Sequence, residues 1–227
     1  MKPLIITNFK TSKEATGENA LKLARAHEQA AKSKGADVII AVQNADIYRI
    51  VSAGVSIPVF AQHADPVEYG SHTGSQLPEA LKAAGASGVV INHAERKLPN
   101  DEVIKIVARC KQSGLKALVC VETLEKVPVL LKSNPDYLAF EVPELIGTLK
   151  SLSRLQPHSV RKFAEIVDKY NKTVHTKVVP LCGAGVADGA DVAKALELGT
   201  RGVLVATAIV GAHDPKKMIE EMASVSV

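Results

Sequence analysis

The sequence lacks any apolar run that approaches the ~20 residues needed by a membrane-spanning helix. Its first residues, MKPLIITNFK, contain a short apolar run and no small-residue cleavage site, unlike a secretory signal peptide. The three cysteines, Cys110, Cys120 and Cys182, are far apart and form no C-x-x-C pair. Scattered cysteines without a secretory signal predict reduced thiols in a cytoplasmic protein that does not associate with membranes.

A strong excess of charge and a cluster of metal-binding residues are also missing. Lys and Arg number 28 against 24 Asp and Glu, a net charge of +4, and no basic block with interleaved aromatic residues occurs. This composition argues against nucleic-acid binding and is compatible with a small anionic ligand. No histidine pair has H-x-x-x-H spacing, so we predict no metal site.

Short apolar, β-branched runs recur eight times along the chain. Each is nearly continuous in apolarity, as expected of strands that are buried on both faces of a parallel sheet. The predicted strands occupy residues 3–9, 37–43, 57–63, 88–94, 116–122, 137–143, 177–183 and 202–208.

Stretches rich in Ala, Leu, Lys and Glu lie between these runs. Residues 18–35 carry an apolar stripe and end at Gly35, a residue that favours a helix terminus. Residues 100–114 follow the same pattern, with Asn100 expected as the N-cap, and so do residues 188–199. This alternation of buried strand and amphipathic helix predicts right-handed βαβ units.

Eight strands and about eight helices close naturally into an α/β fold of the (β/α)₈ barrel type, for which ~250 residues is typical. The rival is a doubly wound open sheet, which often carries G-x-G-x-x-G after its first strand. Here the first strand ends in TNFK without such glycines, and no linker or low-complexity tract divides the chain. We therefore predict one barrel domain over residues 1–227.

Polar residues follow several of the predicted strands. Functional groups of a (β/α)₈ barrel project from the carboxyl ends of its strands, so these residues are the candidates for a site. Short loops of Gly, Ala and Thr follow the last two strands, where backbone N–H groups suit an anion and phosphate commonly binds. The predicted ligand is therefore a small phosphorylated compound. The polar strand-end candidates are Asn8, Lys10, Gln43, Gln62, His63, Asn92, His93, Glu95 and Glu141, and the small ones are Gly183, Gly185, Ala206 and Thr207.

Five motifs in order, NFK, NHAER, EVPELIGT, CGAG and GVLVATA, resemble the triosephosphate isomerase family in its compact archaeal form. The resemblance covers essentially the whole chain. It implies an aldose–ketose isomerase that interconverts dihydroxyacetone phosphate and glyceraldehyde 3-phosphate without a cofactor.

The resemblance also implies the roles of individual residues. Glu141 is expected to be the base, His93 the neutral electrophile and Lys10 the cation, with Glu95 as the partner of Lys10. A helix starting near Glu95 is expected to favour the uncharged imidazole. Glu144 follows a proline and is expected to be a carboxylate in a first helical turn. The substrate-binding groups are expected from Asn8, Lys10, Ile146, Gly147, Gly185, Ala206 and Thr207.

Three positions depart from the pattern of the family. Ala94 stands where a serine is usual, Val142 where a proline is common, and Leu149 replaces the last glycine of glycine-threonine-glycine. A left-handed backbone at Leu149 costs roughly 1–2 kcal/mol. Residues 142–149 are the implied lid that excludes water, so these changes bear on lid closure. Two alternatives stay open: a catalytically idle sugar-phosphate-binding barrel, and another phosphate-binding barrel isomerase.

The stretch EYGSHTGS, residues 68–75, is long for a loop in so short a protein. Its small polar residues suit a projecting tip. The resemblance implies that this loop inserts into a neighbouring subunit with Thr73 reaching toward Lys10, so we expect a homodimer or homotetramer.

Overall fold

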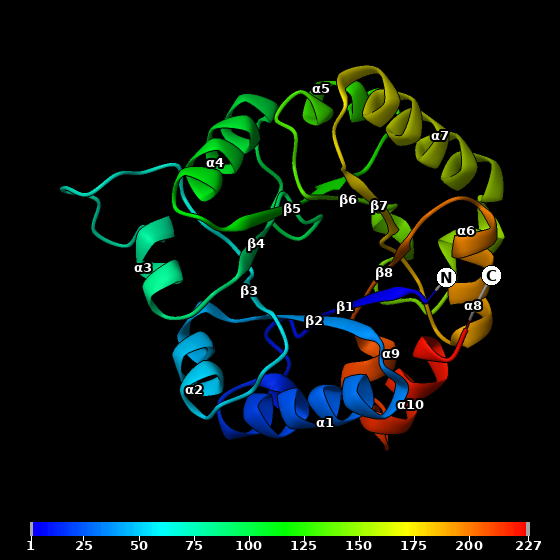
Figure 1. The fold of residues 1–227 in the computed structure, drawn as a ribbon, viewed down its shortest axis with the longest axis horizontal. Helices are drawn as coiled ribbons and strands as arrows, with labels where there is room; N and C mark the ends of the chain where they lie inside the picture. The colour runs from blue at the N-terminus through cyan, green and yellow to red at the C-terminus, as the bar shows by residue number, and fades with distance from the viewer. Residues whose placement is uncertain (1, 226–227) are drawn as a thin grey trace.

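The computed structural model describes residues 2–225, and within them the chain forms a closed barrel of parallel strands surrounded by helices (Figure 1). The strands pair in chain order from β1 to β8, and β8 closes on β1. The (β/α)₈ prediction is confirmed, as are all eight predicted strands. They are β1 (Leu4–Asn8), β2 (Asp37–Val42), β3 (Val59–Ala61), β4 (Gly88–Ile91), β5 (Lys116–Val121), β6 (Tyr137–Phe140), β7 (Val179–Cys182) and β8 (Gly202–Val205).

The helices pack around the barrel and bury the outward-facing strand residues. The α-helices are α1 (Glu18–Lys34), α2 (Ile47–Ser52), α3 (Pro78–Ala83), α4 (Asn100–Gln112), α5 (Val127–Leu131), α6 (Leu152–Leu155), α7 (Pro157–Val174), α8 (Gly189–Glu197), α9 (Thr207–Val210) and α10 (Pro215–Ala223). The short 3₁₀ turns within residues 2–225 are η1 (Lys13–Ala15), η2 (Asn44–Asp46) and η3 (Pro143–Leu145). None of the helices within residues 2–225 is both long and apolar enough to cross a bilayer.

Two apolar cores follow from the alternation of side chains along each strand. On β1, Ile5 belongs to the core between strands and helices, and Ile6 belongs to the core inside the barrel. Phe60 and Tyr137 fill the inside, with ring centroids 6.0 Å apart. The interior is therefore packed, and a site can form only at an end of the barrel.

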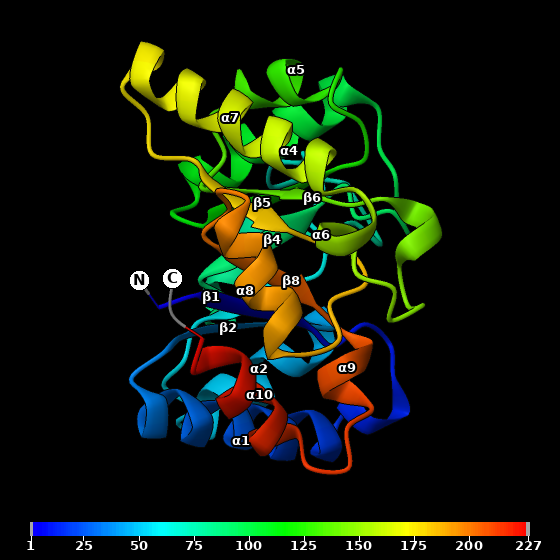
Figure 2. The same cartoon turned by 90° about the vertical axis from the view of Figure 1, so that its right-hand side faces the viewer.

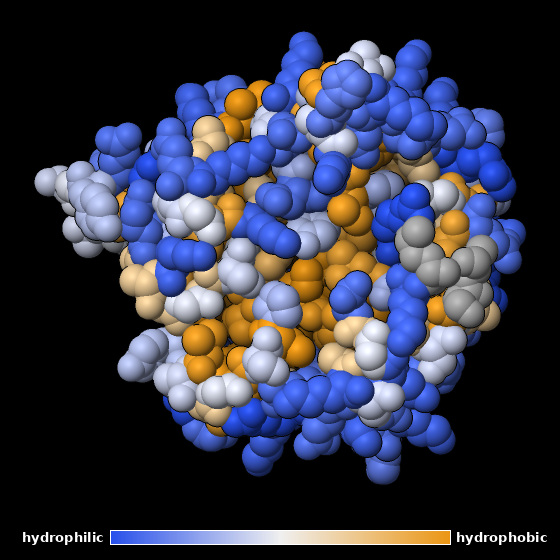
Figure 3. Space-filling model, viewed as in Figure 1, coloured by the Kyte–Doolittle hydropathy of each residue, from blue (hydrophilic) through white to orange (hydrophobic). Residues whose placement is uncertain are grey.

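The two ends of the barrel differ in character. Figure 3 shows the amino-terminal face, where apolar side chains gather in a central hollow surrounded by polar ones. Leu4, Ile39, Ile57, Pro58 and Val179 are among the residues that line this hollow. In Figure 2 the segment that leads from β6 into α6 lies at the opposite, carboxyl-terminal end. The predicted site residues either end a strand, as Asn8 ends β1, or follow one, and therefore lie at that opposite end.

The helix boundaries correct two expectations. Helix α1 ends at Gly35, which adopts the left-handed conformation (φ 56°), as predicted. Asn100, however, is the first residue of α4 and not its N-cap, a position taken by Pro99 without a capping side chain. Residues 93–96 form a turn closed by a 2.7 Å hydrogen bond from the Arg96 N–H to the His93 carbonyl. The helix expected near Glu95 is therefore absent there.

Candidate active site

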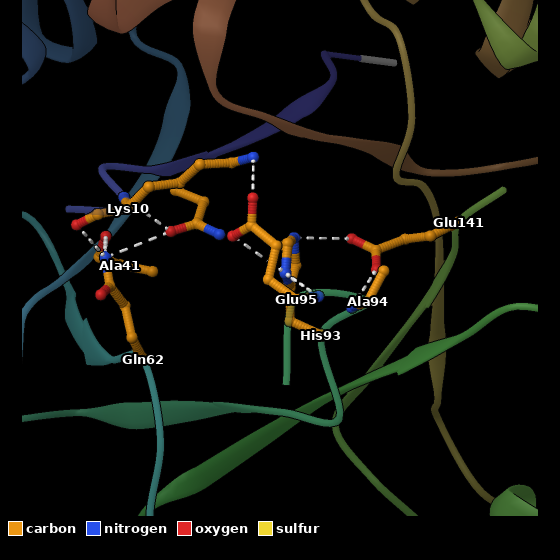
Figure 4. Close-up of polar contacts among 8 residues, drawn as sticks. Lys10, Ala41, Gln62, His93, Ala94, Glu95 and Glu141 are labelled. Carbon is orange, nitrogen blue, oxygen red and sulfur yellow. Dashed lines mark hydrogen bonds and ion pairs between the residues drawn. The ribbon is translucent and has the colours of Figure 1, made fainter. Parts of the chain in front are cut away.

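The side chains of Lys10, His93 and Glu141 line one cavity at the carboxyl-terminal mouth of the barrel. Lys10 follows β1, His93 follows β4 and Glu141 directly follows β6. These strands are distant in sequence, and closure of the barrel brings their ends together (Figure 4). The same cavity is lined by all the predicted substrate-binding residues, Asn8, Ile146, Gly147, Gly185, Ala206 and Thr207.

Glu141 is almost completely buried, with 1% of its surface exposed. Its Oε2 atom accepts a 3.3 Å hydrogen bond from the Ala94 N–H, and its Oε1 atom lies 3.4 Å from His93 Nε2. Burial raises the pKa of the Glu141 carboxyl from 4.5 to about 8, although the Ala94 N–H, the Cys120 thiol and the charge of Lys10 act in the opposite direction. A carboxylate with a raised pKa in a cavity is a strong proton acceptor once ionised.

His93 lies between Glu141 and Glu95. Its Nδ1 atom accepts a 3.2 Å hydrogen bond from the Glu95 N–H, which assigns the imidazole proton to Nε2, the nitrogen that faces Glu141. Burial lowers the pKa of His93. The negative charge of Glu95 raises this pKa and the positive charge of Lys10 lowers it, so that burial decides the direction. The neutral imidazole expected from the sequence is thus supported by burial and a backbone donor, and not by a helix N-terminus.

Lys10 is fixed by its own backbone and by Glu95. Its Nζ atom donates a 2.6 Å hydrogen bond to Glu95 Oε1. The backbone of Lys10 is left-handed (φ 51°), and its N–H donates to Asn8 Oδ1 over 3.0 Å while its carbonyl accepts from Gln62 Nε2 over 2.9 Å. The expected pairing of Lys10 with Glu95 is present, and the cation reaches the cavity on a constrained loop.

Two glycines after β7 allow close backbone approach. A Cβ atom on Gly185 would lie 1.9 Å from the Lys150 carbonyl oxygen, and the residue has φ +68°. A Cβ atom on Gly183 would lie 2.7 Å from Glu141 Cγ. Gly185 therefore lets the loop after β7 contact the segment beyond the lid, and Gly183 makes room for the buried glutamate.

The predicted lid, residues 142–149, forms η3 followed by turns. Glu144 lies in η3 with an exposed side chain, whereas Glu141 faces the cavity. Leu149 adopts the left-handed conformation (φ 57°), so the strain of roughly 1–2 kcal/mol expected for a leucine there applies. Ala94 supplies its backbone N–H to Glu141 at the position where a serine is usual.

Several supporting residues were not assigned a role from the sequence. Gln62 holds the left-handed Lys10 loop through its amide. Asn92, also left-handed (φ 62°), donates to the Cys120 carbonyl and accepts from the Leu98 N–H, which fixes the loop that carries His93. Both residues carry side-chain amides at strand ends, and asparagine is enriched in left-handed backbone conformations. These two features are the signals in the sequence that could have indicated a structural role.

His63 and Cys182 do not line the cavity that holds Glu141. His63 is buried and its Nε2 atom lies 2.9 Å from Asp65 Oδ1, which suits a positioning role. Cys182 is fully buried, and burial raises the pKa of its thiol to about 12, so it is no nucleophile. Among residues 2–225, no group of three or more His, Cys, Asp or Glu could hold a metal ion.

Comparison with known proteins gives a consistent result. The family model for triosephosphate isomerase matches residues 3–222. The chain belongs to the triosephosphate isomerase family. It is 44% identical to the triosephosphate isomerase of Methanothermus fervidus over 97% of both chains. It is 39% identical to that of Saccharolobus solfataricus over 96% of this chain and 94% of the other.

Among solved structures, the triosephosphate isomerase of Bartonella henselae superposes with a TM-score of 0.73 at 25% identity. That superposition covers 96% of this chain and 98% of the other. Membership of the triosephosphate isomerase family therefore rests on sequence and on fold, over nearly the whole chain.

Proposed function

We propose that this chain, as a triosephosphate isomerase, interconverts dihydroxyacetone phosphate and D-glyceraldehyde 3-phosphate with Glu141 as the base, His93 as the electrophile and Lys10 as the cation. The observation that carries the proposal is the sharing of one cavity by these three side chains and the small-residue loops. Neither alternative function gains support from a specific feature of the site.

The first chemical step is removal of a proton from the carbon beside the substrate carbonyl. The ionised Glu141 carboxylate takes this proton, and burial makes it a stronger base than an exposed carboxylate. The Nε2–H of His93 donates a hydrogen bond to the carbonyl oxygen as negative charge develops on it. The product is an enediolate. Glu141 returns the proton to the neighbouring carbon, while the hydroxyl proton of the first carbon passes to the oxygen of the second, so that the carbonyl group changes place.

Lys10 supplies the fixed positive charge. Its ammonium group lies in the same cavity and offsets the charge of the enediolate and of the phosphate. The N–H groups of Ile146, Gly147, Gly185, Ala206 and Thr207 are proposed to hold the phosphate, because all five residues line the cavity and Gly147, Gly185 and Ala206 leave the backbone accessible. Asn8, whose Oδ1 atom accepts from the Lys10 N–H, is proposed to orient the cation.

The proposed assembly is a homodimer or homotetramer. The loop that contains Thr73 projects far from the barrel between β3 and α3 (Figure 1), and Tyr69 in it is 78% exposed. Hydrogen bonds between Asp65 and Gln76 close the base of the loop, so the tip is presented on a fixed stem. Light scattering of the purified protein tests this proposal. A cytoplasmic location stays a prediction from the cysteine pattern.

A coupled assay with dihydroxyacetone phosphate tests the function. We expect turnover by the parent and a loss of about 10²–10⁴-fold in kcat for Glu141→Asp and for His93→Gln. The matched control is Glu165→Asp, an exposed glutamate on α7 outside the cavity and the lid, and Glu144→Asp makes the same change at the neighbouring glutamate. An inactive parent that still binds 2-phosphoglycolate contradicts the proposal and favours an idle binding protein. Equal losses for the Glu141 and Glu144 variants contradict the assignment of the base.

A further inference from the structure

The segment that follows the lid lies directly on the loop after β7. The Lys150 carbonyl occupies the space beside Gly185 that a side chain would need. The Leu152 N–H donates a 3.2 Å hydrogen bond to the Ala184 carbonyl, and Ser153 Oγ donates over 3.3 Å to the Asp191 carbonyl. The end of the lid and the proposed phosphate-binding loop are therefore in contact through their backbones.

Asp191 is a buried carboxylate at the start of α8, with 2% of its surface exposed. Its Oδ2 atom accepts a 2.9 Å hydrogen bond from the Ala187 N–H. Its Oδ1 atom forms an ion pair with Arg154 Nε, and within residues 2–225 no hydrogen-bond donor satisfies this atom. A buried carboxylate oxygen without a partner is costly, so the pair holds Arg154 in place.

Arg154 also contacts a second carboxylate. Its Nη2 atom lies 3.2 Å from Asp188 Oδ1, and Asp188 caps α8 by accepting from the Asp191 N–H over 2.8 Å. Arg154 belongs to α6, at the end of the segment that follows the lid, whereas both aspartates belong to the loop and helix that follow β7. One guanidinium thus joins the two phosphate-binding regions.

We propose that Arg154 is a positioning residue that anchors the fixed end of the lid to the phosphate-binding loop through Asp191 and Asp188. The anchor makes residues 142–149 close about a fixed point, so that Ile146 and Gly147 meet the same phosphate as Gly185. Arg154 itself does not line the cavity that holds Glu141. This proposal rests on the function proposed above.

A purely structural role for Arg154 makes a different prediction. A structural ion pair affects thermal stability, and an anchor also affects how tightly the phosphate and the enediolate are held. Arg25 and Glu28 on α1 offer a matched pair, since an arginine with 42% side-chain exposure contacts a carboxylate with 7%. The corresponding values for Arg154 and Asp191 are 53% and 3%.

Retention of the enediolate has its own chemical signature. If the phosphate is held poorly, the enediolate electrons form a new carbon–carbon double bond while the bond from C3 to the phosphate oxygen breaks. Inorganic phosphate leaves with that electron pair, and the remaining enol rearranges to 2-oxopropanal. No oxidant or co-reactant is needed, so released phosphate per isomerisation reports on how the lid holds the intermediate.

The test compares the parent with Arg154→Met, Arg154→Lys and Arg25→Met. For Arg154→Met we expect the dissociation constant of 2-phosphoglycolate and the KM to rise about tenfold, with about tenfold more phosphate released per turnover. Arg154→Lys keeps the positive charge, so we expect its KM, its affinity for 2-phosphoglycolate and its phosphate release to lie between those of the parent and Arg154→Met. This variant replaces Arg154→Met in the test if the methionine variant does not fold. Arg25→Met is expected to lower Tm while leaving KM and phosphate release unchanged.

The outcomes separate the two proposals. If Arg154→Met matches Arg25→Met in ligand affinity and phosphate release, the anchor is wrong while the function stands. If the parent does not isomerise dihydroxyacetone phosphate, the proposed function is wrong, and the affinity for 2-phosphoglycolate still decides the anchor. If Arg154→Met binds 2-phosphoglycolate as tightly as the parent, the anchor proposal is wrong, whether or not the parent is an active isomerase.

Discussion

Burial of Glu141 opposes folding, and this cost depends on pH. The pKa of the carboxyl is raised from 4.5 to about 8 in the folded protein, so between these values the folded state binds more protons than the unfolded state. The free energy of unfolding therefore falls as pH rises from 4.5 to 8. At about 1.4 kcal/mol per pH unit, the full effect is about 5 kcal/mol.

The substitution Glu141→Gln removes this ionisation and preserves the shape of the side chain. We expect the variant to become more stable relative to the parent as pH rises, by about 4 kcal/mol between pH 5 and pH 8.5. Folded domains typically have a free energy of unfolding of about 5–15 kcal/mol, so this gain is a large part of the total. The same variant should lose about 10²–10⁴-fold in kcat, because the amide cannot accept the substrate proton.

Urea unfolding of both proteins at several pH values measures the effect. One protomer concentration must be kept throughout, since assembly also contributes to apparent stability. The quantity of interest is the difference between variant and parent, in which the other titrating groups cancel. A difference that changes by less than about 1 kcal/mol over this pH range refutes the reasoning, because the carboxyl then ionises in the folded state as it does in water.

Two further predictions concern other buried groups. Burial lowers the pKa of His27 from 6.5 to about 4, so the free energy of unfolding falls by about 3.5 kcal/mol as pH falls through this range. In urea unfolding, His27→Gln should therefore lose less stability than the parent as pH falls. An equal loss in both proteins shows that His27 is not the titrating group. In Gly183→Ala the new Cβ atom meets Glu141 Cγ at 2.7 Å, so kcat should fall about tenfold or more. Gly189→Ala, whose Cβ atom makes ordinary contacts, should retain activity. Equal kcat values for the two variants in a steady-state assay contradict the packing argument.

The fold was predictable because its signal is local and repeated. Each strand is short and apolar, the helices α1, α4 and α8 carry an apolar face, and strand and helix alternate around the barrel. The helix near Glu95 that the resemblance implied is absent. The Leu98 N–H donates to Asn92 Oδ1 and the Arg96 N–H to the His93 carbonyl, and these bonds hold the segment in a turn.

The sequence by itself determined which residues end the strands, and so which side chains could meet at the mouth of the barrel. Only the tertiary structure decided how they behave there. The pKa of Glu141 is set by burial, the Nε2 proton of His93 by the Glu95 N–H, and the pairing of Arg154 with Asp191 by contact between α6 and α8. Burial and pairing depend on atoms that are distant in sequence, and no local pattern of residues reports them.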